Sequence, residues 1–396
     1  MDNLISENKP KLIRTSTVAI SLDYLLKGQL KFLNNHYEVL AASGTDAHLE
    51  NVFLREGVRV VNVPMQRDIS PIKDLITLWK LYLLFCNEKP KIVHSITPKA
   101  GLLSMTAAYF ARVPIRVHTF TGLIFPTKTG IFQKLLILMD KLLCFFATNI
   151  YPEGEGVKND LTNYKITKKP LRIIANGNVN GVDINFFDSK LFNNEKKTLL
   201  RRSLAINASN FVFIFVGRLV GDKGINELVV AFKKLQTTSS LPFQLSLILV
   251  GPLEPLLDPL KPKTLKEINN NKNIISVGFK SDIRPYLSIS DILVFPSHRE
   301  GFPNVVLQAG AMGLPCIVSD INGCNEIIEE GKNGWIIPVK DENAILNSMR
   351  NCILDINKTT IKKSNIRNII ENRFQQEIVW QALLKEYKLL EKNIIK

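Results

Sequence analysis

The sequence predicts an α/β protein built from two doubly wound, mainly parallel sheets. Apolar runs of strand length alternate with helix-compatible segments through both halves of the chain, and this alternation is typical of parallel strands joined by crossover helices. The chain has 396 residues, which exceeds the roughly 250–300 residues at which a single hydrophobic core stops growing. Together these two observations indicate two Rossmann-like domains.

The elements of the first half follow one another in a regular order. Apolar runs predict strands at residues 17–20, 37–42, 58–63, 91–94 and 115–119. The longest helix between them is expected at residues 72–86, where apolar side chains recur at helical spacing: Ile72, Leu75, Ile76, Trp79 and Leu83. We interpret this stripe as the face that covers the sheet, and Trp79 as a core residue.

The second half repeats the same rhythm. Strands are predicted at residues 211–216, 245–250, 274–277, 292–295, 316–318 and 335–338, and an amphipathic helix at 375–393. The Gly and Asn residues of segment 173–183 suit turns and left-handed backbone, so this segment is expected to connect the domains. We predict an N-terminal domain at residues 1–187, a C-terminal domain at 188–375 and a final helix at 376–396.

Composition agrees with a large cytoplasmic protein. The apolar content of 45% is ample for two cores. The cysteines are scattered and lack metal-ligand spacing, so they are interpreted as reduced thiols: Cys86, Cys144, Cys316, Cys324 and Cys352. Residues 1–10 lack the basic-then-apolar order of a signal peptide and are expected to form a disordered lead-in.

The formal net charge of +15 suggests an anionic partner. The lysines are dispersed, without an arginine-rich arm or an aromatic stacking platform, which argues against nucleic acid. An anionic membrane surface is the favoured partner, with the protein peripheral on the inner face of the cell membrane.

Residues 131–146 are the segment that could meet such a membrane. The run is intensely apolar but is interrupted by Lys134, Asp140 and Lys141, so it is too short and too charged to span a bilayer. Two interpretations are open. The segment is an amphipathic helix with one face on the protein and another on the membrane, or it is a wholly buried helix.

The segment 297–309 carries the first candidate site. A strand-like run ends at residue 296 and helix-compatible residues begin at 304, so the pattern is strand, tight loop, helix. The loop and helix start are formed by Gly301, Phe302, Pro303 and Asn304. Glycine admits close backbone approach, proline suits a first helical turn, and free N–H groups at a helix start attract phosphate. This predicts a phosphorylated ligand, with Glu300 facing the group attached to it; alternatively, Glu300 only caps the helix.

A second strand-loop-helix lies upstream. The strand-like run 211–216 is followed by Gly217 and a basic loop, and then by a helical pattern at 225–235. Arg218 can direct two hydrogen bonds to diphosphate oxygens and Lys223 adds a point charge. The loop is therefore expected to neutralise a diphosphate; the alternative is an ordinary solvated basic turn.

The two segments resemble the signatures of the retaining, nucleotide-sugar-dependent glycosyltransferases of family 4, which have the two-domain GT-B fold. The resemblance extends from Thr17 to about Tyr387. It implies that Arg218 and Lys223 bind the donor diphosphate and that Glu300 contacts the donor sugar hydroxyls. The family's second glutamate is replaced by Gln308, whose carbonyl oxygen could still accept from ribose hydroxyls. By the same resemblance, Gly251 borders the nucleotide and Phe279 forms a wall for the base.

In the N-terminal domain, the candidate residues lie near the ends of two predicted strands, 17–20 and 115–119. Thr121 occupies the position where many relatives carry a His or Glu facing the reacting sugar carbon, and its hydroxyl can only hydrogen-bond. His118, three residues earlier, is either a cleft-lining side chain or a satisfied core histidine. Gly28 stands in an early loop-to-helix element where small residues admit donor or acceptor.

The activity implied by the resemblance is retaining transfer of a hexose from UDP or another nucleoside diphosphate. An N-acetylated hexose is the favoured sugar. The implied acceptor is a lipid-diphosphate-linked glycan of capsule, O-antigen or related polysaccharide synthesis. No metal or other cofactor is expected, because two cations can neutralise the leaving diphosphate. Two alternatives stay open: a nucleotide-sugar epimerase of the same fold, and a non-catalytic membrane-associated relative.

Overall fold

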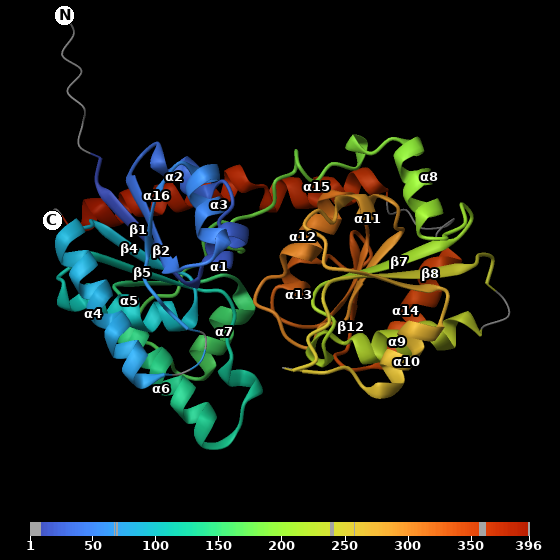
Figure 1. Cartoon of the computed structure of the whole chain (residues 1–396), viewed down its shortest axis with the longest axis horizontal. Helices are drawn as coiled ribbons and strands as arrows, with labels where there is room; N and C mark the ends of the chain where they lie inside the picture. The colour runs from blue at the N-terminus through green and yellow to red at the C-terminus, as the bar shows by residue number, and fades with distance from the viewer. Residues whose placement is uncertain are drawn as a thin grey trace, which may run out of the picture. The chain divides into compact units, whose positions relative to one another are not determined.

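A computed structural model describes residues 9–66, 68, 70–237, 241–256, 258–355 and 362–394. The chain forms two compact units: residues 1–180 with 376–396, called unit 1, and residues 181–375, called unit 2. Each unit contains one six-stranded sheet covered by helices (Figure 1). The predicted pair of doubly wound parallel sheets is thereby confirmed. Most of the expected lead-in, residues 1–8, lies outside the described residues.

The sheet of unit 1 has the strand order β3-β2-β1-β4-β5-β6, and all neighbours pair in parallel. Its strands are β1 Lys11–Val18, β2 Glu38–Gly44, β3 Arg59–Asn62, β4 Ile92–Ser95, β5 Ile115–Phe120 and β6 Asn149–Pro152. Its helices are α1 Ala19–Leu25, α2 Gln29–Asn34, α3 Ala47–Glu56, α4 Pro71–Glu88, α5 Pro98–Phe110, α6 Gly130–Phe146, α7 Glu155–Asn163 and α16 Gln376–Ile394, with a 3₁₀ turn at Phe125–Thr127.

Two separate apolar clusters lie within unit 1. One cluster joins the sheet to α4, α5 and α6, which pack in that order. The other joins the sheet to α1, α2, α3 and the C-terminal helix α16. A parallel sheet buried on both faces needs helices on each side, and α16 supplies part of one layer although it is distant in sequence.

The first strand was predicted at residues 17–20, but β1 runs over Lys11–Val18 and α1 begins at Ala19. The polar run Arg14-Thr15-Ser16 hides this strand in the sequence because such residues are usually exposed. In the structure all three are buried. Arg14 Nη1 donates to Gln29 Oε1 and to Tyr387 Oη, each at 3.0 Å. The sixth strand, β6, was not predicted.

The orientation of α4 also differs from the prediction. Thr77, Leu81 and Phe85 are its buried residues, whereas the predicted core stripe is exposed, with Trp79 60% exposed. The helix is apolar on two sides, and periodicity alone does not say which side finds the sheet. Trp79 is a surface residue.

Unit 2 has the strand order β12-β11-β10-β7-β8-β9, again all parallel. Its strands are β7 Phe211–Val216, β8 Leu245–Val250, β9 Ile274–Gly278, β10 Ile292–Phe295, β11 Cys316–Ser319 and β12 Gly334–Ile337. Its helices are α8 Asn194–Ser203, α9 Ile225–Gln236, α10 Pro262–Asn270, α11 Arg284–Ser288, α12 Asn304–Ala311, α13 Cys324–Ile327, α14 Glu342–Asp355 and α15 Lys363–Phe374, with 3₁₀ turns at Ser189–Leu191 and Gly221–Lys223.

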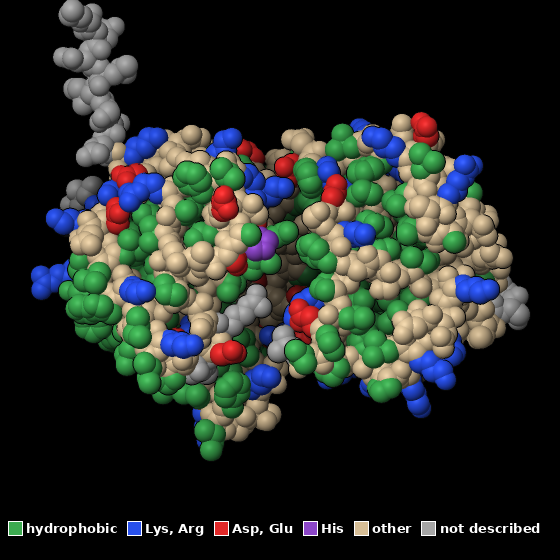
Figure 2. All heavy atoms as spheres, viewed as in Figure 1, with side chains coloured by type: hydrophobic (Ala, Val, Ile, Leu, Met, Phe, Trp, Pro, Cys, Tyr) green, Lys and Arg blue, Asp and Glu red, His purple; other side chains and the backbone are tan. Residues whose placement is uncertain are grey.

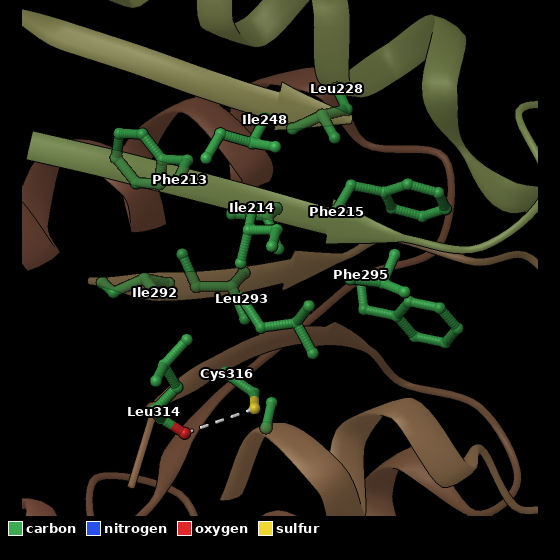
Figure 3. Packing of buried hydrophobic residues seen from close by; sticks show 14 of the residues in the cluster. Phe213, Ile214, Phe215, Leu228, Ile248, Ile292, Leu293, Phe295, Leu314 and Cys316 are labelled. Atoms are coloured by element: carbon green, nitrogen blue, oxygen red, sulfur yellow. Dashed lines mark hydrogen bonds between the residues drawn. The ribbon is translucent and has the colours of Figure 1, made fainter. Parts of the chain in front are cut away.

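The core of unit 2 explains why its strands were predicted almost to the residue. β7, β8 and β10 are buried along their whole length, so they appear in the sequence as continuous apolar runs. Side chains from these strands and from α9 meet in one cluster (Figure 3). Near the ends of β7 and β10, the rings of Phe215 and Phe295 stack with centroids 5.8 Å apart.

The change from unit 1 to unit 2 occurs at Asn180/Gly181, seven residues before the predicted 187/188. Asn180 Nδ2 donates to Lys27 O at 2.9 Å, and Asn180 Oδ1 accepts from Trp380 Nε1 at 2.6 Å, within unit 1. Two residues later, Val182 N donates to Phe374 O at 2.8 Å, within unit 2. Residues 181–187 are thus held by the second core, not the first.

Candidate functional site

Unit 2 brings together the two loops that the sequence singles out. β7 and β10 are neighbouring parallel strands, so their carboxyl ends lie at the same edge of the sheet, where ligands of open α/β sheets bind. The loop after β7 leads through the 3₁₀ turn Gly221–Lys223 into α9, and the loop after β10 leads into α12.

Backbone contacts hold these loops against each other. The carbonyl of Asp222 accepts from His298 N at 2.8 Å and from Ser297 Oγ at 3.4 Å. Gly224 adopts φ +70°, and a Cβ placed there would lie 2.1 Å from Pro296 O. Only glycine permits both the left-handed backbone and this close approach. The packing of the two loops therefore depends on the absence of a side chain at Gly224.

The main finding at this edge is an ion pair between two of the predicted catalytic residues. Lys223 Nζ contacts Glu300 Oε1, and their side chains are only 14% and 16% exposed. Residues 77 positions apart are thus brought together by adjacent strands. Near them, burial raises the pKa of the Cys324 thiol well above its usual value, and the Glu300 carboxylate adds to this effect. Cys324 is therefore a protonated, unreactive thiol.

Arg218 lies on a more open part of the same edge. Its Nη1 donates to Glu254 Oε2 at 2.7 Å, and its side chain is 44% exposed. Gly217 and Gly251 form the backbone around it, because a Cβ on Gly251 would lie 1.8 Å from Gly217 O. The loops after β7 and β8 thus run in close contact. Glu254 was not singled out from the sequence, since an isolated acid in a loop carries no spacing signal.

The start of α12 supplies backbone and one amide side chain. Pro303 is the N-cap residue, with Asn304 first in the helix. Phe302 is 6% exposed, and its ring packs on Phe374 with centroids 5.6 Å apart. Its side chain is therefore part of the core, and the backbone of the loop is what a ligand could contact. Gln308 lies one turn further along α12 and is partly exposed.

Two further predicted residues lie in the segments that follow β10 and β9. A Cβ built on Gly323 would lie 2.4 Å from Gly301 O, so Gly301 is in close contact with the turn before α13. Phe279, after β9, is 64% exposed, so its ring is accessible as the predicted wall for a base.

In unit 1, two of the predicted contacts are corrected by the structure. His118 is fully buried, and Nδ1 pairs with Ser95 Oγ at 2.7 Å. Burial lowers the pKa of His118 to about 3, so it is a neutral core histidine and its side chain does not reach a substrate. Gly28 does not open a ligand site, because a Cβ there would lie 2.7 Å from the ring of Trp380. The backbone N–H of Gly28 is already bonded to Glu56 Oε1 at 2.9 Å.

Thr121 remains a candidate in unit 1. It is partly exposed, and its hydroxyl donates to Ile96 O at 2.8 Å, which joins the segments after β4 and β5. A hydroxyl that donates to a backbone carbonyl still has lone pairs to accept a hydrogen bond.

Sequence reasoning missed a buried polar network behind these loops. His94 Nδ1 pairs with Tyr387 Oη at 2.5 Å and Nε2 with Thr119 Oγ1 at 2.7 Å. Burial, with the nearby Arg14 cation, lowers the pKa of His94 well below its usual value. The network ties β1, β4 and β5 to α16 and is structural. Because its members are 293 positions apart, no local pattern could have revealed it.

The chemistry of the unit 2 edge suits an anionic ligand that also carries hydroxyl groups. Arg218 and Lys223 supply positive charge, and the helix start at Asn304 supplies a favourable dipole. Glu300 is an acceptor for hydroxyl groups. Within the described ranges, no group of three or more His, Cys, Asp and Glu side chains is placed to hold a metal ion.

Comparisons with known proteins agree with this picture. The family model "Glycosyltransferase Family 4" matches residues 18–178, and "Glycosyl transferases group 1" matches residues 196–369. The capsular polysaccharide biosynthesis glycosyltransferase CapM of Staphylococcus aureus is 32% identical over 378 residues, covering 95% of this chain and 96% of CapM.

A second relative is similar to most of the chain. The UDP-Gal:alpha-D-GlcNAc-diphosphoundecaprenol alpha-1,3-galactosyltransferase of Escherichia coli is 32% identical over 328 residues, covering 81% of each protein. Among solved structures, Anabaena HepE in complex with UDP-glucose has a TM-score of 0.79 at 20% identity, covering 96% of this chain and 99% of that one. This last likeness concerns the fold.

Proposed function

The chain belongs to the family 4 glycosyltransferases of polysaccharide biosynthesis, and from this premise we propose that it transfers a hexose, with retention, to a lipid-diphosphate-linked glycan. The donor is a nucleoside-diphosphate sugar, and UDP is the favoured nucleotide. The observation that carries the proposal is the Lys223–Glu300 pair at the carboxyl ends of β7 and β10. In this proposal, Lys223 is the cation that binds the diphosphate, and Glu300 beside it is the acceptor for the sugar hydroxyls.

The names of the relatives support the choice of substrates. The Escherichia coli relative acts with UDP-Gal on a diphosphoundecaprenol-linked sugar, as its name states, and the Staphylococcus aureus relative belongs to capsule synthesis. Both resemble this chain over more than three quarters of its length. The preference for an N-acetylated hexose rests on family likeness alone.

The ion pair suggests how the donor is received. Lys223 and Glu300 neutralise each other. When the donor enters, Lys223 turns to the diphosphate oxygens, while Glu300 accepts from the sugar hydroxyls. Each charged group exchanges one partner for another, so neither is left buried and unpaired.

The transfer step follows from the same charges. The bond between the anomeric carbon and the diphosphate oxygen breaks, and the electron pair leaves with the diphosphate. Arg218 and Lys223 stabilise this developing negative charge. A bond then forms between the anomeric carbon and the acceptor hydroxyl oxygen on the same face, and the hydroxyl proton passes to the departing diphosphate. We propose that this step proceeds without a metal ion, because the two side chains supply the neutralising charge.

The proposed place of reaction is the cytoplasmic face of the membrane, since a lipid-linked acceptor is held there. No helix of the described chain has both the length and the apolar character required to cross a bilayer. We propose that the protein contacts the membrane by peripheral attachment.

The test is to measure nucleotide release and lipid mass gain together, with a panel of UDP-, GDP- and dTDP-sugars and detergent-solubilised bacterial lipids, with and without EDTA. We expect release coupled to a gain of one hexose unit, unchanged by EDTA. Lys223→Ala should lower turnover by about 100-fold or more, the usual cost of removing one charge-stabilising donor. Lys233→Ala is the matched control, because Lys233 also pairs with a glutamate, Glu267, but on the exposed side of α9. Donor isomerisation without mass gain would instead identify an epimerase.

A further inference from the structure

The outer faces of α4 and α6 in unit 1 expose several large apolar side chains. On α4 these are Ile72, Leu75, Ile76, Trp79 and Leu83, and on α6 they are Ile131, Phe132, Leu135, Leu138, Leu142 and Phe145. Their exposed fractions range from 42% to 87%. Figure 2 shows hydrophobic side chains over this part of unit 1. Soluble monomers rarely expose contiguous apolar patches larger than a few hundred Å². We therefore expect this surface to be covered by a partner.

The two faces belong to one helical layer. α5 packs against α4 on one side and against α6 on the other, and its end adds Tyr109 and Phe110, which are 44% and 61% exposed. Aromatic rings continue from there to Phe145, whose centroid lies 6.5 Å from that of Tyr109. On α4, Trp79 stacks on Tyr82 with centroids 5.5 Å apart. Tryptophan and tyrosine are the side chains that favour the membrane-water interface.

Charges on these helices are sorted by sign. The exposed charged residues of α4 and α6 are all basic: Lys73, Lys80, Lys134 and Lys141. The acids are turned towards the protein and are only partly exposed. Asp74 pairs with Lys99 at 2.6 Å, and Glu88 pairs with Lys11 at 2.7 Å. The surface that faces solvent is therefore apolar with positive charges, which matches an interface rich in acidic lipid headgroups.

We propose that the outer faces of α4 and α6 together dock unit 1 on an anionic lipid bilayer. The apolar side chains enter the headgroup region, and the four lysines contact acidic headgroups. A second copy of the chain fits this surface less well, because it would bring two sets of lysines face to face. The proposal deepens the proposed function by naming the surface that meets the membrane of the lipid-linked acceptor, and it rests on that function only for the choice of a bilayer.

Vesicle flotation of the whole protein tests the surface without any substrate. We expect co-flotation with phosphatidylcholine vesicles containing phosphatidylglycerol, and much less with phosphatidylcholine alone. Lys80→Glu/Lys134→Glu should weaken partition by at least about 30-fold, because two lysines near acidic headgroups are lost and the two new carboxylates are repelled by them. Ile76→Ser/Leu138→Ser should weaken binding to both kinds of vesicle.

Two matched controls come from unit 2. Lys263→Glu/Lys266→Glu changes two exposed lysines of α10, and Leu199→Ser changes a leucine of α8 that is 56% exposed. Both should float like the unchanged protein. Circular dichroism checks that every variant is folded, and a second apolar pair, Leu75→Ser/Leu135→Ser, replaces any that is not.

Three results would overturn the proposal. The first is absence of co-flotation with anionic vesicles at low salt. The second is flotation that the α4 and α6 variants leave unchanged. The third is a dimer, by light scattering, that the same variants convert to monomer. Sugar transfer to a short-chain, detergent-dispersed acceptor should survive in the α4 and α6 variants, so failure of the membrane surface and failure of the enzymatic proposal are told apart.

Discussion

Asp140 on α6 should make unit 1 less stable as the pH rises. The residue lies on the inner face of the helix, at helical spacing from the buried Leu143 and the partly buried Leu136. Burial raises the pKa of its carboxyl to about 7. No ion pair of the described chain offsets this burial. The folded chain therefore favours the protonated form, whereas the unfolded chain has the ordinary value of 3.8.

The sign follows from which state holds the proton. Below pH 3.8, both states are protonated and the residue contributes no pH dependence. Between 3.8 and about 7, the unfolded state loses its proton first, so the free energy of unfolding falls as pH rises. Above about pH 7, both states are ionised and the loss is complete. The full difference between the two pKa values corresponds to about 4 kcal/mol. Because the side chain keeps partial contact with water, this is an upper bound, and we expect about 2–4 kcal/mol.

Asp140→Asn removes the charge and keeps the shape, so it should remove this loss. We expect the variant to be more stable than the unchanged protein by about 2–4 kcal/mol at pH 8, with the difference shrinking towards zero near pH 4. Urea unfolding followed by circular dichroism at intervals between pH 4 and pH 8.5 measures it. The burial of the Cys144 thiol, which raises its pKa to about 12, keeps that neighbour neutral throughout.

Glu50→Gln is the control. It makes the same change from carboxyl to amide, but at an exposed residue on α3 of the same unit. It should show little difference from the unchanged protein at any pH. A stability gain from Asp140→Asn that is equal at pH 4.5 and pH 8, or no gain at pH 8, would refute the reasoning.

Three further substitutions test the site and its corrections. Gly224→Ala places a Cβ 2.1 Å from Pro296 O at φ +70°. The substitution should lower the free energy of unfolding by about 2–4 kcal/mol and raise the donor KM. If the urea midpoint and the KM were both unchanged, the tight packing of the two loops would be contradicted. Gly28→Ala should lower stability by about 1–3 kcal/mol through its overlap with Trp380 and leave the donor KM unchanged, whereas a KM effect at full stability would restore Gly28 as a ligand contact. Gln308→Glu should alter the donor KM by several-fold with the melting temperature unchanged, and an unaltered KM would place Gln308 away from the ribose.

The loops of unit 2 could be predicted from the local sequence because the residues that form each loop are consecutive. Gly217 to Gly224 and Glu300 to Asn304 each combine a strand end, a turn and a helix start, which depend on near neighbours. The strands beneath them are buried on both faces, so they stand out as unbroken apolar runs such as β7.

Tertiary structure decided what consecutive residues cannot specify. β1 was misplaced because its polar residues are buried by partners such as Tyr387, 373 positions from Arg14. α4 presents two apolar stripes, and only the packed sheet determined that Leu81 faces inward and Trp79 outward.

The predicted site residues divide in the same way. Trp380, which comes from the end of the chain, fills the space beside Gly28, and the surrounding core closes off His118. The charges of Lys223 and Glu300 were evident from sequence, but their contact exists only because β7 and β10 became neighbours. The local sequence determines the hydrophobic periodicity of an element and the side chains of a loop. Which side chains are buried, and which ones pair, depends on segments that meet only after the chain has folded.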